Sequence, residues 1–413
     1  AVLEMIRWNV RTPEEVTGDL RSQVAANHVC AQKIVEMMTD EGLSTLDELA
    51  DEIIMRTEKS MRGAIQSIPN GIYPFEGVIE GSGKRDDIRI KLTVNVEDSD
   101  IRVDFDGTAP QVDWGVNVVY NFTYAYVFMA IKSAFDPDLP INEGAIRPVK
   151  MTAPEGSVVN CSFPAPVAAR MQVGHFMTEM VFRALSEATP DHIIAGSGGT
   201  PAQTNIFYGK RNNGKPWHTM IIRGGGLGAA KKQDGHHCAI FPANGANTPV
   251  EILESDTPLL VASRELLCDS GGAGAHRGGL GRRMQLKVPD DETAPIPPVA
   301  IAVQAGRFQY PPEGFFGGHP GTRAGFLING SNGDPGGLTF TEPGDVITFD
   351  SAGGGGFGNP LERDIAAVER DVKFEYVSIG KAERVYGVVI DPVSGCADTA
   401  ASHGLHLLEL NSH

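Results

Sequence analysis

The chain contains little cysteine: five residues in 413, an odd number, widely separated along the sequence. No two of them form a Cys-x-x-Cys pair. Disulfide frameworks and zinc ribbons both depend on paired, regularly spaced cysteines. The sequence therefore predicts neither, and we expect reduced thiols and a cytoplasmic location.

Long hydrophobic runs and excess positive charge are also missing. The most apolar stretch, 116–131, is interrupted by Asn117, Asn121 and Thr123. It is shorter than the ~20 apolar residues that a membrane-crossing helix needs, so it favours a buried helix. Lys and Arg number 35 against 52 Asp and Glu, a formal net charge of −17. This balance argues against partners with a nucleic-acid or anionic membrane surface.

Glycine is abundant instead, with 49 residues concentrated in runs such as 269–281 and 351–358. Glycine costs conformational entropy on folding, so dense runs are kept where a side chain cannot be accommodated. Either the backbone there turns with positive φ, or another group approaches too closely for a Cβ. Two roles stay open for these runs: a purely architectural one, or backbone N–H groups that line a ligand passage or a partner surface.

Hydrophobic periodicity predicts an α+β fold in three parts. Residues 1–190 read as a mixed α/β region, with helices at 14–42, from 44 to before 69, at 117–135 and at 166–188. The strict alternation at 88–97 and 101–106 predicts an antiparallel hairpin in the same region. Residues 191–358 read as a β-rich region with glycine loops, and 359–413 as short helices and a tail. The strands expected in the β-rich region are 203–208, 217–223, 236–241, 259–268, 282–288, 298–306 and 344–350.

Two motifs are interpreted as structural. Residues 209–215 fit the first seven positions of a phosphate-binding loop, but Pro216 follows in place of Ser or Thr and no helix is expected next. A hairpin turn explains these residues. In Asp234-Gly-His-His-Cys238, a strand would put only His236 and Cys238 on one side, which is too few ligands for a closed metal site. We assign no metal ligand.

Candidate binding residues lie at the ends of predicted elements, where loops commonly build sites. Arg170, at a predicted helix start, could clamp a carboxylate or phosphate, although pairing with a structural carboxylate is the favoured reading for it and for Arg147, Arg277 and Arg307. Isolated histidines such as His175 are expected to be hydrogen-bonded or solvated. The substrate-binding candidates are Asp106, Asn117, Asn142, Arg147, Arg170, Gly353, Gly354, Gly355 and Gly356. No catalytic residue is assigned.

Several segments together resemble the B-type subunit of the hydantoinase B/5-oxoprolinase family. The resemblance runs in order along nearly the whole chain. The segments that carry it include Asp104-Phe-Asp-Gly-Thr-Ala-Pro-Gln111, Pro164-Ala-Pro-Val-Ala-Ala-Arg170, Asp269-Ser-Gly-Gly-Ala-Gly274 and Gly353-Gly-Gly-Gly-Phe-Gly-Asn-Pro-Leu-Glu-Arg-Asp364.

This resemblance implies a subunit of an ATP-dependent enzyme that opens cyclic amides such as hydantoins, 5-oxoproline or caprolactam. It implies a hetero-oligomer with an A-type subunit, which would bind most of the ATP and Mg²⁺. Two alternatives remain: a subunit of an acetone- or acetophenone-type carboxylase, or a scaffold without catalysis that docks the ATPase subunit.

The resemblance also implies a divalent metal such as zinc or manganese, held by an N-terminal Asn-Asp-Pro-Tyr segment and by histidine–aspartate motifs. The chain contains no Asn-Asp-Pro and no His-x-x-Asp. We expect the metal-binding segment to precede Ala1, in a truncated, processed or split subunit.

Overall fold

The computed structural model describes residues 1–81, 85–290, 297–398 and 401–402, and it confirms the α+β class. The helices are α1 (Val2–Asn9), α2 (Pro13–Asp40), α3 (Asp47–Ile65), α4 (Tyr120–Phe135), α5 (Glu143–Ile146), α6 (Met171–Leu185), α7 (Val250–Asp256), the short 3-10 helix η1 (Pro360–Glu362), α8 (Ile365–Lys373) and α9 (Ile379–Tyr386). The strands are β1 (Gly71–Ile79), β2 (Ile88–Glu97), β3 (Asp100–Asp104), β4 (Val149–Thr152), β5 (Gln203–Lys210), β6 (Pro216–Arg223), β7 (Leu260–Leu266), β8 (Arg282–Lys287), β9 (Val299–Gln304), β10 (Gly325–Ile328), β11 (Ser331–Asn332), β12 (Leu338–Thr341) and β13 (Val346–Asp350). No helix in the described ranges is long and apolar enough to cross a bilayer.

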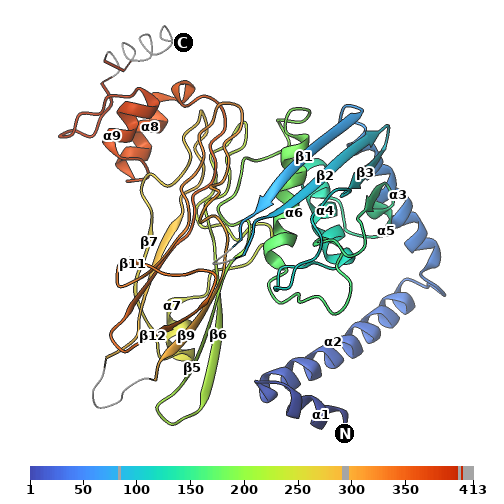
Figure 1. Ribbon diagram of the computed structural model, residues 1–413. Helices are drawn as coiled ribbons and strands as arrows, with labels where there is room; N and C mark the ends of the chain where they lie inside the picture. The colour runs from blue at the N-terminus through green and yellow to red at the C-terminus, as the bar shows by residue number, and fades with distance from the viewer. Residues whose placement is uncertain (82–84, 291–296, 399–400, 403–413) are drawn as a thin grey trace.

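The N-terminal part is a conventional sheet covered by helices (Figure 1). Its strand order is β1-β2-β3-β4, antiparallel except for the parallel pair β3–β4. Strand β2 alternates between buried and exposed positions, which is why Ile88, Ile90 and Leu92 reach the core while Arg89 and Lys91 face solvent. Helix α6 packs on β1 and β2, and α4 packs on α6. The largest hydrophobic cluster of the chain lies between this sheet and these helices.

The β-rich part is a sandwich of two antiparallel sheets. One has the order β11-β10-β13-β8-β7 and the other β12-β9-β5-β6. Their inner faces share one hydrophobic cluster, in which the rings of Phe207 on β5 and Phe349 on β13 meet edge to face at 6.1 Å. Two sheets that bury one common face are the usual solution for antiparallel strands with one apolar side.

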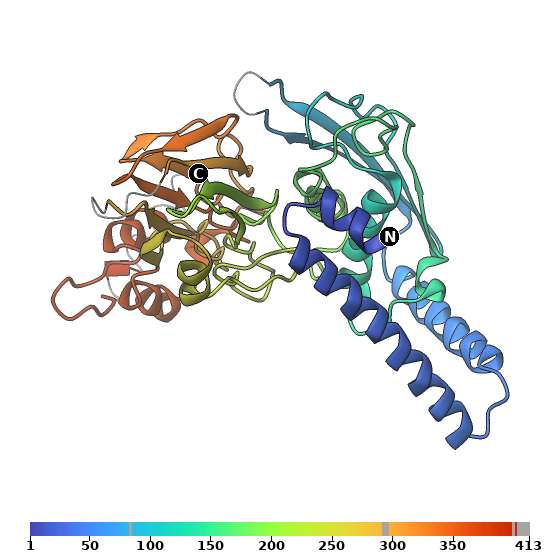
Figure 2. The same ribbon diagram turned by 90° about the horizontal axis from the view of Figure 1, so that it is seen from below.

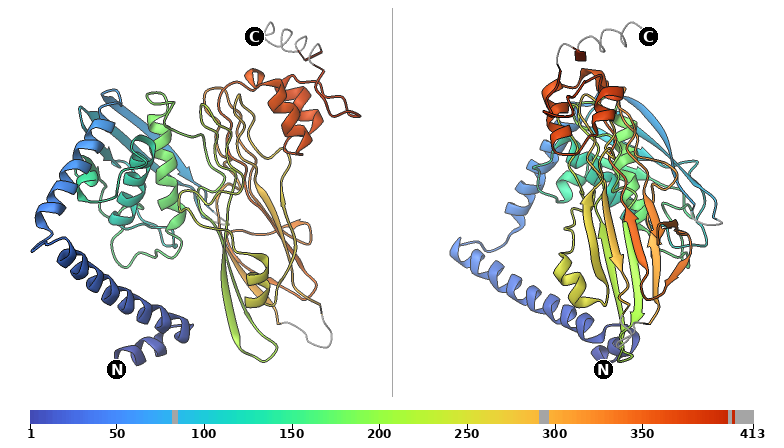
Figure 3. Two further views of the ribbon diagram at one scale, coloured as in Figure 1. Left: turned by 180° about the vertical axis from the view of Figure 1, so that it is seen from behind. Right: turned by 90° about the vertical axis from the view of Figure 1, so that its left-hand side faces the viewer.

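The glycine runs form a third kind of structure, which we call the glycine bundle. It consists of the segments 194–200, 224–230, 235–239, 270–281, 312–321 and 351–358, drawn in Figure 3 as extended chains without arrows beside the sandwich. Successive residues of the central segment bond to different neighbours: the N–H groups of Gly354, Gly355 and Gly356 donate to the carbonyls of Gly279, Gly196 and His319 at 2.9, 2.8 and 3.0 Å. The N–H groups of three successive residues thus point to three different segments. This fits a polyproline II chain, which has three residues per turn and makes no internal hydrogen bonds.

Close approach, rather than positive φ, explains why these positions are glycine. A Cβ on Gly354 would lie 2.1 Å from the carbonyl oxygen of Leu227, and one on Gly355 would lie 1.9 Å from that of Glu313. Neither residue has φ in the left-handed region. A backbone oxygen held by its own hydrogen bonds cannot move aside as a flexible side chain could, so only glycine fits.

The C-terminal helices pack on the outer end of the glycine bundle (Figure 1). Each begins with a side-chain cap: Asp364 accepts from the N–H of Ala366, and Ser378 accepts from that of Lys381. Helix α9 ends at Gly387, whose φ is +64°. Buried residues of these helices contact Ala273 of the bundle in a third small hydrophobic cluster. The division of the chain at residues 190 and 358 stays a prediction.

Most predicted elements are present, and the differences have physical reasons. The predicted strand 236–241 is wrong: these residues make only isolated bridges, and Cys238 has φ of +52°, which a strand cannot contain. Strand β1 is not predicted by the alternation rule because it contains Pro74, which an edge strand tolerates. Residues 209–215 form the β5–β6 hairpin turn, as expected.

Helix α2 confirms the predicted helix at 14–42 but buries almost nothing. Only Thr17 is buried along its length, and residues 21–37 are all exposed. Figure 2 shows α2 reaching away from the rest of the chain, and α3 leading back from its far end to the N-terminal sheet. The apolar positions of α2 therefore have no covering element among the described residues.

Candidate functional site

Arg170 is the N-cap residue of α6, is exposed, and has few contacts with the rest of the chain. Its guanidinium lies 5.3 Å from the centre of the Phe122 ring on α4, and one nitrogen donates to the carbonyl of Val167 at 3.3 Å. No carboxylate in the described part of the chain forms an ion pair with it. An exposed arginine held over an aromatic face, with most of its donors unused, can still bind a carbonyl or an anion.

His175 lies one and a half turns further along α6 and is 2% exposed. Neither of its ring nitrogens has a hydrogen-bond partner among the described residues. The expectation that this histidine is hydrogen-bonded or solvated is therefore wrong. Burial lowers the pKa of His175 to about 4, so the ring is neutral near pH 7. A neutral imidazole carries one donor and one acceptor, and leaving both unpaired in the interior costs about 1–3 kcal/mol for each group.

Aromatic rings connect these two residues. The Phe122 and Tyr126 rings, one turn apart on α4, are 5.0 Å apart, and the Tyr126 and His175 rings are also 5.0 Å apart. Gly174 lets this stack approach α6, since a Cβ there would lie 2.3 Å from Phe122. Burial raises the pKa of Tyr126, and the charge of Arg170 opposes that rise. We call Arg170, Phe122, Tyr126 and His175 the α6 cluster.

The other arginines considered from the sequence pair with carboxylates, as the favoured reading predicts. Arg147 bonds to Glu58 and Glu143, each at 3.1 Å, on the surface of the N-terminal part. Arg307 is buried and bonds to Glu179 on α6 at 2.5 Å. This Glu179–Arg307 pair lines a cavity of about 150 Å³ between β1, α6 and the glycine bundle. Burial raises the pKa of Glu179, and the charge of Arg307 opposes it.

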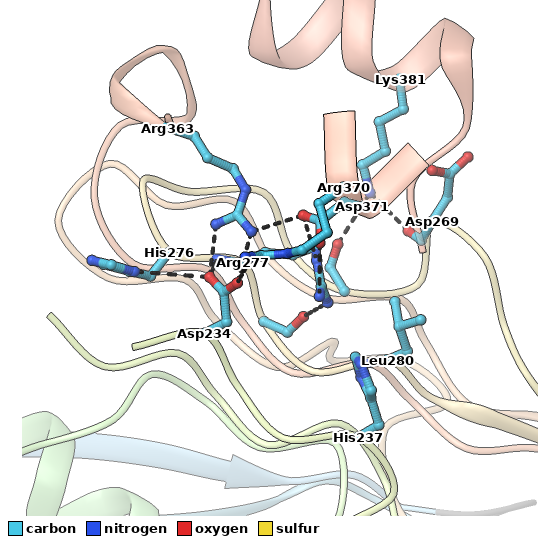
Figure 4. A network of polar contacts seen from close by, with 12 residues as sticks. Asp234, His237, Asp269, His276, Arg277, Leu280, Arg363, Arg370, Asp371 and Lys381 are labelled. Carbon is cyan, nitrogen blue, oxygen red and sulfur yellow. Dashed lines mark hydrogen bonds and ion pairs between the residues drawn. The ribbon is translucent and has the colours of Figure 1, made fainter. Parts of the chain in front are cut away.

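Arg277 belongs to a buried charge network, which we define as Asp234, Arg277, Arg363 and Asp371 (Figure 4). Arg363 bonds to Asp234 through two nitrogens, both at 2.7 Å, and to Asp371 at 2.7 Å. Arg277 donates to Asp371 at 3.1 Å. Burial acts to raise the pKa of Asp234, but the hydrogen bond and charge of Arg363 outweigh it and the pKa lies below its usual range. The charge network joins the C-terminal helices to the glycine bundle.

Two predicted candidates, Asn117 and Asn142, have structural partners. Asn117 is fully buried, accepts from the N–H of Val112 at 2.8 Å, and donates to three carbonyls, one of them that of Pro166 at 2.9 Å. Asn142 caps α5 by accepting from Gly144 at 2.9 Å, and Thr57 donates to the same oxygen at 2.6 Å. Asn117 thus shapes the loop that leads into Arg170, whereas Asn142 joins α5 to α3.

The remaining candidates also lie apart from the α6 cluster. Asp106 is exposed in the turn after β3. Gly353 to Gly356 are buried in the glycine bundle, where the last three donate their N–H groups to backbone carbonyls and Gly353 faces the Thr322 hydroxyl at 3.4 Å. Donors already used in this way are not free to bind a ligand. The structure therefore does not gather the predicted residues into one site.

The described residues do not fit a metal. No group of three or more His, Cys, Asp or Glu side chains in the described ranges is arranged to hold an ion. His237 accepts from the N–H of Leu280 at 2.9 Å, and His236 lies 3.0 Å from the Gln233 amide nitrogen. Burial, reinforced by the charge of Arg277, lowers the pKa of His237 to about 4. The Asp234–Cys238 segment is therefore structural.

The glycine segments and the Pro164–Arg170 loop are spread along most of the chain, so a related protein should resemble it over most of its length. The sequence model of the hydantoinase B/oxoprolinase family matches residues 1–360, and the chain belongs to this family. An uncharacterized protein of Methanocaldococcus jannaschii is 32% identical over 398 residues, which cover 94% of this chain and 67% of that protein.

Two solved structures share the fold. The subunit beta of caprolactamase from Pseudomonas jessenii is 28% identical over 419 residues, covering 97% of this chain and 71% of that subunit. The crystal structure of the ATP-dependent caprolactamase from the same organism superposes with a TM-score of 0.87 at 27% identity, covering 98% of this chain and 72% of that one. The nucleotide-free structure of an acetone carboxylase, at 19% identity and a TM-score of 0.83, covers 99% of this chain and 62% of that one and shows the same fold.

Proposed function

We propose that this chain is the B-type subunit, or the larger part of it, of an ATP-dependent hydrolase that opens cyclic amides. The observation that carries this is the match of nearly the whole chain to the ATP-dependent caprolactamase. We further propose that it works in a hetero-oligomer with an ATP-binding A-type subunit, as the subunit name of that relative suggests. The metal implied by the family resemblance would be held outside the described residues.

The proposed chemistry explains why ATP is needed. An unstrained amide carbonyl is a poor electrophile, and hydrolysing it is not strongly downhill. Transfer of the γ-phosphoryl group to the amide oxygen releases ADP and creates a good leaving group. Water then adds to the carbon, and the C–N bond breaks as the ring nitrogen takes a proton, which leaves an acyl phosphate on the opened chain. A second water hydrolyses this acyl phosphate to a carboxylate and inorganic phosphate. Positive charge and N–H donors around the developing oxyanion lower the barrier.

In this proposal the α6 cluster binds the amide. Arg170 would donate to the carbonyl oxygen, and the Phe122 and Tyr126 rings would form an apolar wall for the ring. A cyclic amide offers one C=O acceptor and one N–H donor side by side. One ring nitrogen of His175, which has no partner among the described residues, would bond to one of these two groups, because the two ring nitrogens point too far apart to reach both. Asp106, Asn142 and Arg147 stay weaker proposals because they lie elsewhere.

The decisive experiment measures ATP hydrolysis by the complex of this subunit with its A-type partner. We expect turnover that depends on a cyclic amide from a panel of caprolactam, hydantoin and 5-oxoproline. No stimulation by any member, combined with stimulation by a ketone plus bicarbonate, would instead favour a carboxylase.

Two variants assign the site within that complex. We expect Arg170→Ala to lower kcat/KM about tenfold or more, with a thermal midpoint within about 2 °C of the parent. His175→Phe should also lose turnover while keeping or raising the midpoint, because it removes unpaired polar groups. The matched control is Arg56→Ala, an exposed arginine on α3 that is paired with Glu52. If Arg170→Ala and Arg56→Ala behave alike, the α6 cluster is not the amide site.

A further inference from the structure

The interior of the sandwich becomes polar where it meets the glycine bundle. Strands β6 and β13 continue directly into bundle segments, and β8 begins where another segment ends (Figure 3). The last residue of β6 is Arg223, which is 1% exposed, and the first residue of β8 is Arg282, which is 5% exposed. These two arginines belong to different sheets and lie buried at the same end of the sandwich.

Arg223 is surrounded by neutral groups. Its guanidinium lies 4.8 Å from the centre of the Phe349 ring on β13. Its Nη1 donates to the hydroxyl of Ser351 at 3.3 Å, and its Nη2 donates to the side-chain oxygen of Gln203 at 3.2 Å. The Asn205 amide, in the orientation that satisfies its hydrogen bonds, accepts from Nε at 2.8 Å. These contacts pair the donors of Arg223 but leave its charge uncompensated.

Arg282 projects to the same interior, next to Ser351. The N–H of Ser351 donates to the carbonyl of Arg282 at 2.8 Å, which continues the register in which Asp350 lies opposite Arg283. Residues that lie opposite each other in an antiparallel pair project to the same face, so the side chains of Arg282 and Ser351 share a face. Because Arg223 donates to the hydroxyl of this same serine, Ser351 neighbours both arginines.

A third arginine, Arg264 on β7, projects to this face as well. It lies opposite Met284, two residues along β8 from Arg282, and side chains two residues apart on a strand share a face. Arg264 donates to the backbone carbonyl of Thr248 at 2.8 Å, and Arg282 donates to the side-chain oxygen of Asn247 at 2.7 Å. We call Arg223, Arg264 and Arg282 the arginine triplet.

No carboxylate balances the charge of the triplet. Within the described ranges all of its hydrogen-bond partners are neutral, and it forms no ion pair. The neighbouring Asp350 is held by Arg283 through two hydrogen bonds of 2.8 and 2.7 Å. The thiol of Cys238 is not a counter-ion either, because burial raises its pKa against the opposing charges of Arg282 and Arg264.

The two buried arginines nevertheless stay charged near pH 7. Burial, reinforced by the charge of Arg282, lowers the pKa of Arg223 to about 9. Burial, reinforced by the charge of Arg264, lowers the pKa of Arg282 to about 10. Both pKa values lie above 7, so the positive charges persist inside the protein. A buried charge without a counter-ion is strongly destabilising, and a bound anion would remove that cost.

One buried donor of the triplet is also unpaired. The Nε–H of Arg282 has no hydrogen-bond partner in the part of the chain that the structure describes. A buried donor without a partner costs its full desolvation free energy. A water molecule could accept this hydrogen bond, but it would leave the charge uncompensated. An anion would do both.

We propose that a small monovalent anion of the halide class, chloride under cellular conditions, binds at the Nε–H of Arg282 within the arginine triplet. A halide accepts N–H donors from any direction and is small enough to lie among packed side chains. A dianion such as sulfate or phosphate would cost far more to dehydrate in a buried position. The bound anion would connect β6, β7 and β8 at the end of the sandwich where the glycine bundle begins.

Thermal unfolding of the full chain tests the site by linkage. Sodium gluconate, whose anion is too large for the site, is replaced stepwise by sodium chloride or sodium bromide at constant ionic strength. We expect both halides to raise the thermal midpoint along a saturating curve, by about 2 °C or more, because they bind the folded state alone. A midpoint that does not change, or that changes without saturation, overturns the proposal. Saturable stabilisation by sulfate but not by halides overturns the choice of a monovalent anion.

Variants separate this site from general effects of salt. Arg282→Met removes the charge and the unpaired donor while keeping an unbranched side chain, so the halide response should disappear. Its midpoint without halide should equal or exceed that of the parent, because a buried charge has been removed. Arg102→Gln, which removes an exposed arginine on β3, should keep the full halide response. Equal responses of the two variants overturn the proposal.

A crystal of the unmodified chain grown in bromide locates the anion directly. We expect an anomalous-scattering peak within hydrogen-bonding reach of the Arg282 Nε, and the absence of a peak there overturns the proposal even if Arg282→Met fails to fold. None of these results depends on the amide-hydrolase proposal, because no turnover is measured.

Discussion

The N-terminal sheet and the glycine bundle solve the same problem in opposite ways. In the sheet, alternating side chains fill the space between β2 and the helices above it, so the backbones stay apart. In the bundle, the backbones themselves fill the interior, and the nearest groups to Gly354 and Gly355 are carbonyl oxygens. Apolar side chains fill the interior of the N-terminal part, whereas glycine backbones without side chains fill the interior of the bundle.

This difference decides how each region tolerates change. A hydrophobic core can repack around a substitution of similar volume. A bundle of hydrogen-bonded backbones has no side chains to rearrange, so an added methyl group must displace main chain. The two regions should therefore respond very differently to the same chemical change.

The largest contrast is expected from one methyl group placed in each region. Gly355→Ala would put its Cβ 1.9 Å from the carbonyl oxygen of Glu313, and we expect loss of more than about 4 kcal/mol or failure to fold. The matched change, Gly63→Ala on the exposed side of α3, meets nothing within 4 Å and should stabilise by up to about 1 kcal/mol. Urea denaturation and soluble yield measure both. Similar effects for the two variants would show that the bundle can relax.

The next contrast concerns charge. Asp371→Ala removes the acceptor that Arg277 and Arg363 share inside the charge network. It should cost about 3–5 kcal/mol because the buried Arg277 loses its carboxylate partner and Arg363 keeps only Asp234. Glu58→Ala removes the acceptor shared by Arg62 and Arg147 on the exposed surface of the N-terminal part. Its effect should be far smaller, since water replaces the lost partner. Equal losses in chemical denaturation would contradict the buried role of the network.

A third contrast is the pH dependence of stability, which tests the burial of His175 in the α6 cluster. The pKa of His175 is about 4 in the folded chain and near 6.5 when exposed, so the unfolded state binds the extra proton between these values. Because burial disfavours the protonated ring, His175 causes no pH-dependent loss of stability above pH 6.5. The folded state loses stability as pH falls from 6.5 toward 4, by at most about 3 kcal/mol. His175→Phe should flatten this part of the stability profile, while His28→Gln on the exposed α2 should not. An unchanged slope for His175→Phe would show that this ring does not titrate with folding.

The smallest effect is expected at Asn142. Asn142→Ala removes the cap of α5 and the acceptor for Thr57, and it should lower stability by about 1–2 kcal/mol. If Asn142 is only structural, KM of the complex for its amide should stay constant. A raised KM with an unchanged thermal midpoint would indicate that Asn142 binds the substrate.

The elements that sequence patterns predict correctly are those with side-chain periodicity. The alternation at 88–97 gives β2, and the helical spacing at 14–42 gives α2. The strand predicted at 236–241 fails because its apolar and polar residues sit among backbone segments of the bundle, where alternation has no meaning. The polyproline-like segments have no side-chain signature apart from glycine itself.

The candidate site shows the same division. Its position after Pro164 and at a helix start marks Arg170 as a candidate, but the sequence does not reveal that Arg147, Arg277 and Arg307 have carboxylate partners while Arg170 has none. The sequence also cannot show that His175, five residues after Arg170, is unpaired, because hydrogen bonding of a helical histidine depends on neighbours from other parts of the chain. The signal for His175 appears only when α4 brings Tyr126 against α6.

The sequence by itself determined the family, the α+β class, and the fact that the glycine runs exclude side chains. Those properties depend on residue identity and local spacing. Only the tertiary structure decided that close approach of backbones is what excludes them, that Arg170 has no carboxylate partner whereas Arg147, Arg277 and Arg307 have one, and that the buried His175 ring is left unpaired. Each of these depends on segments far apart in the chain, whose contacts arise when they pack and not from the local pattern of either one.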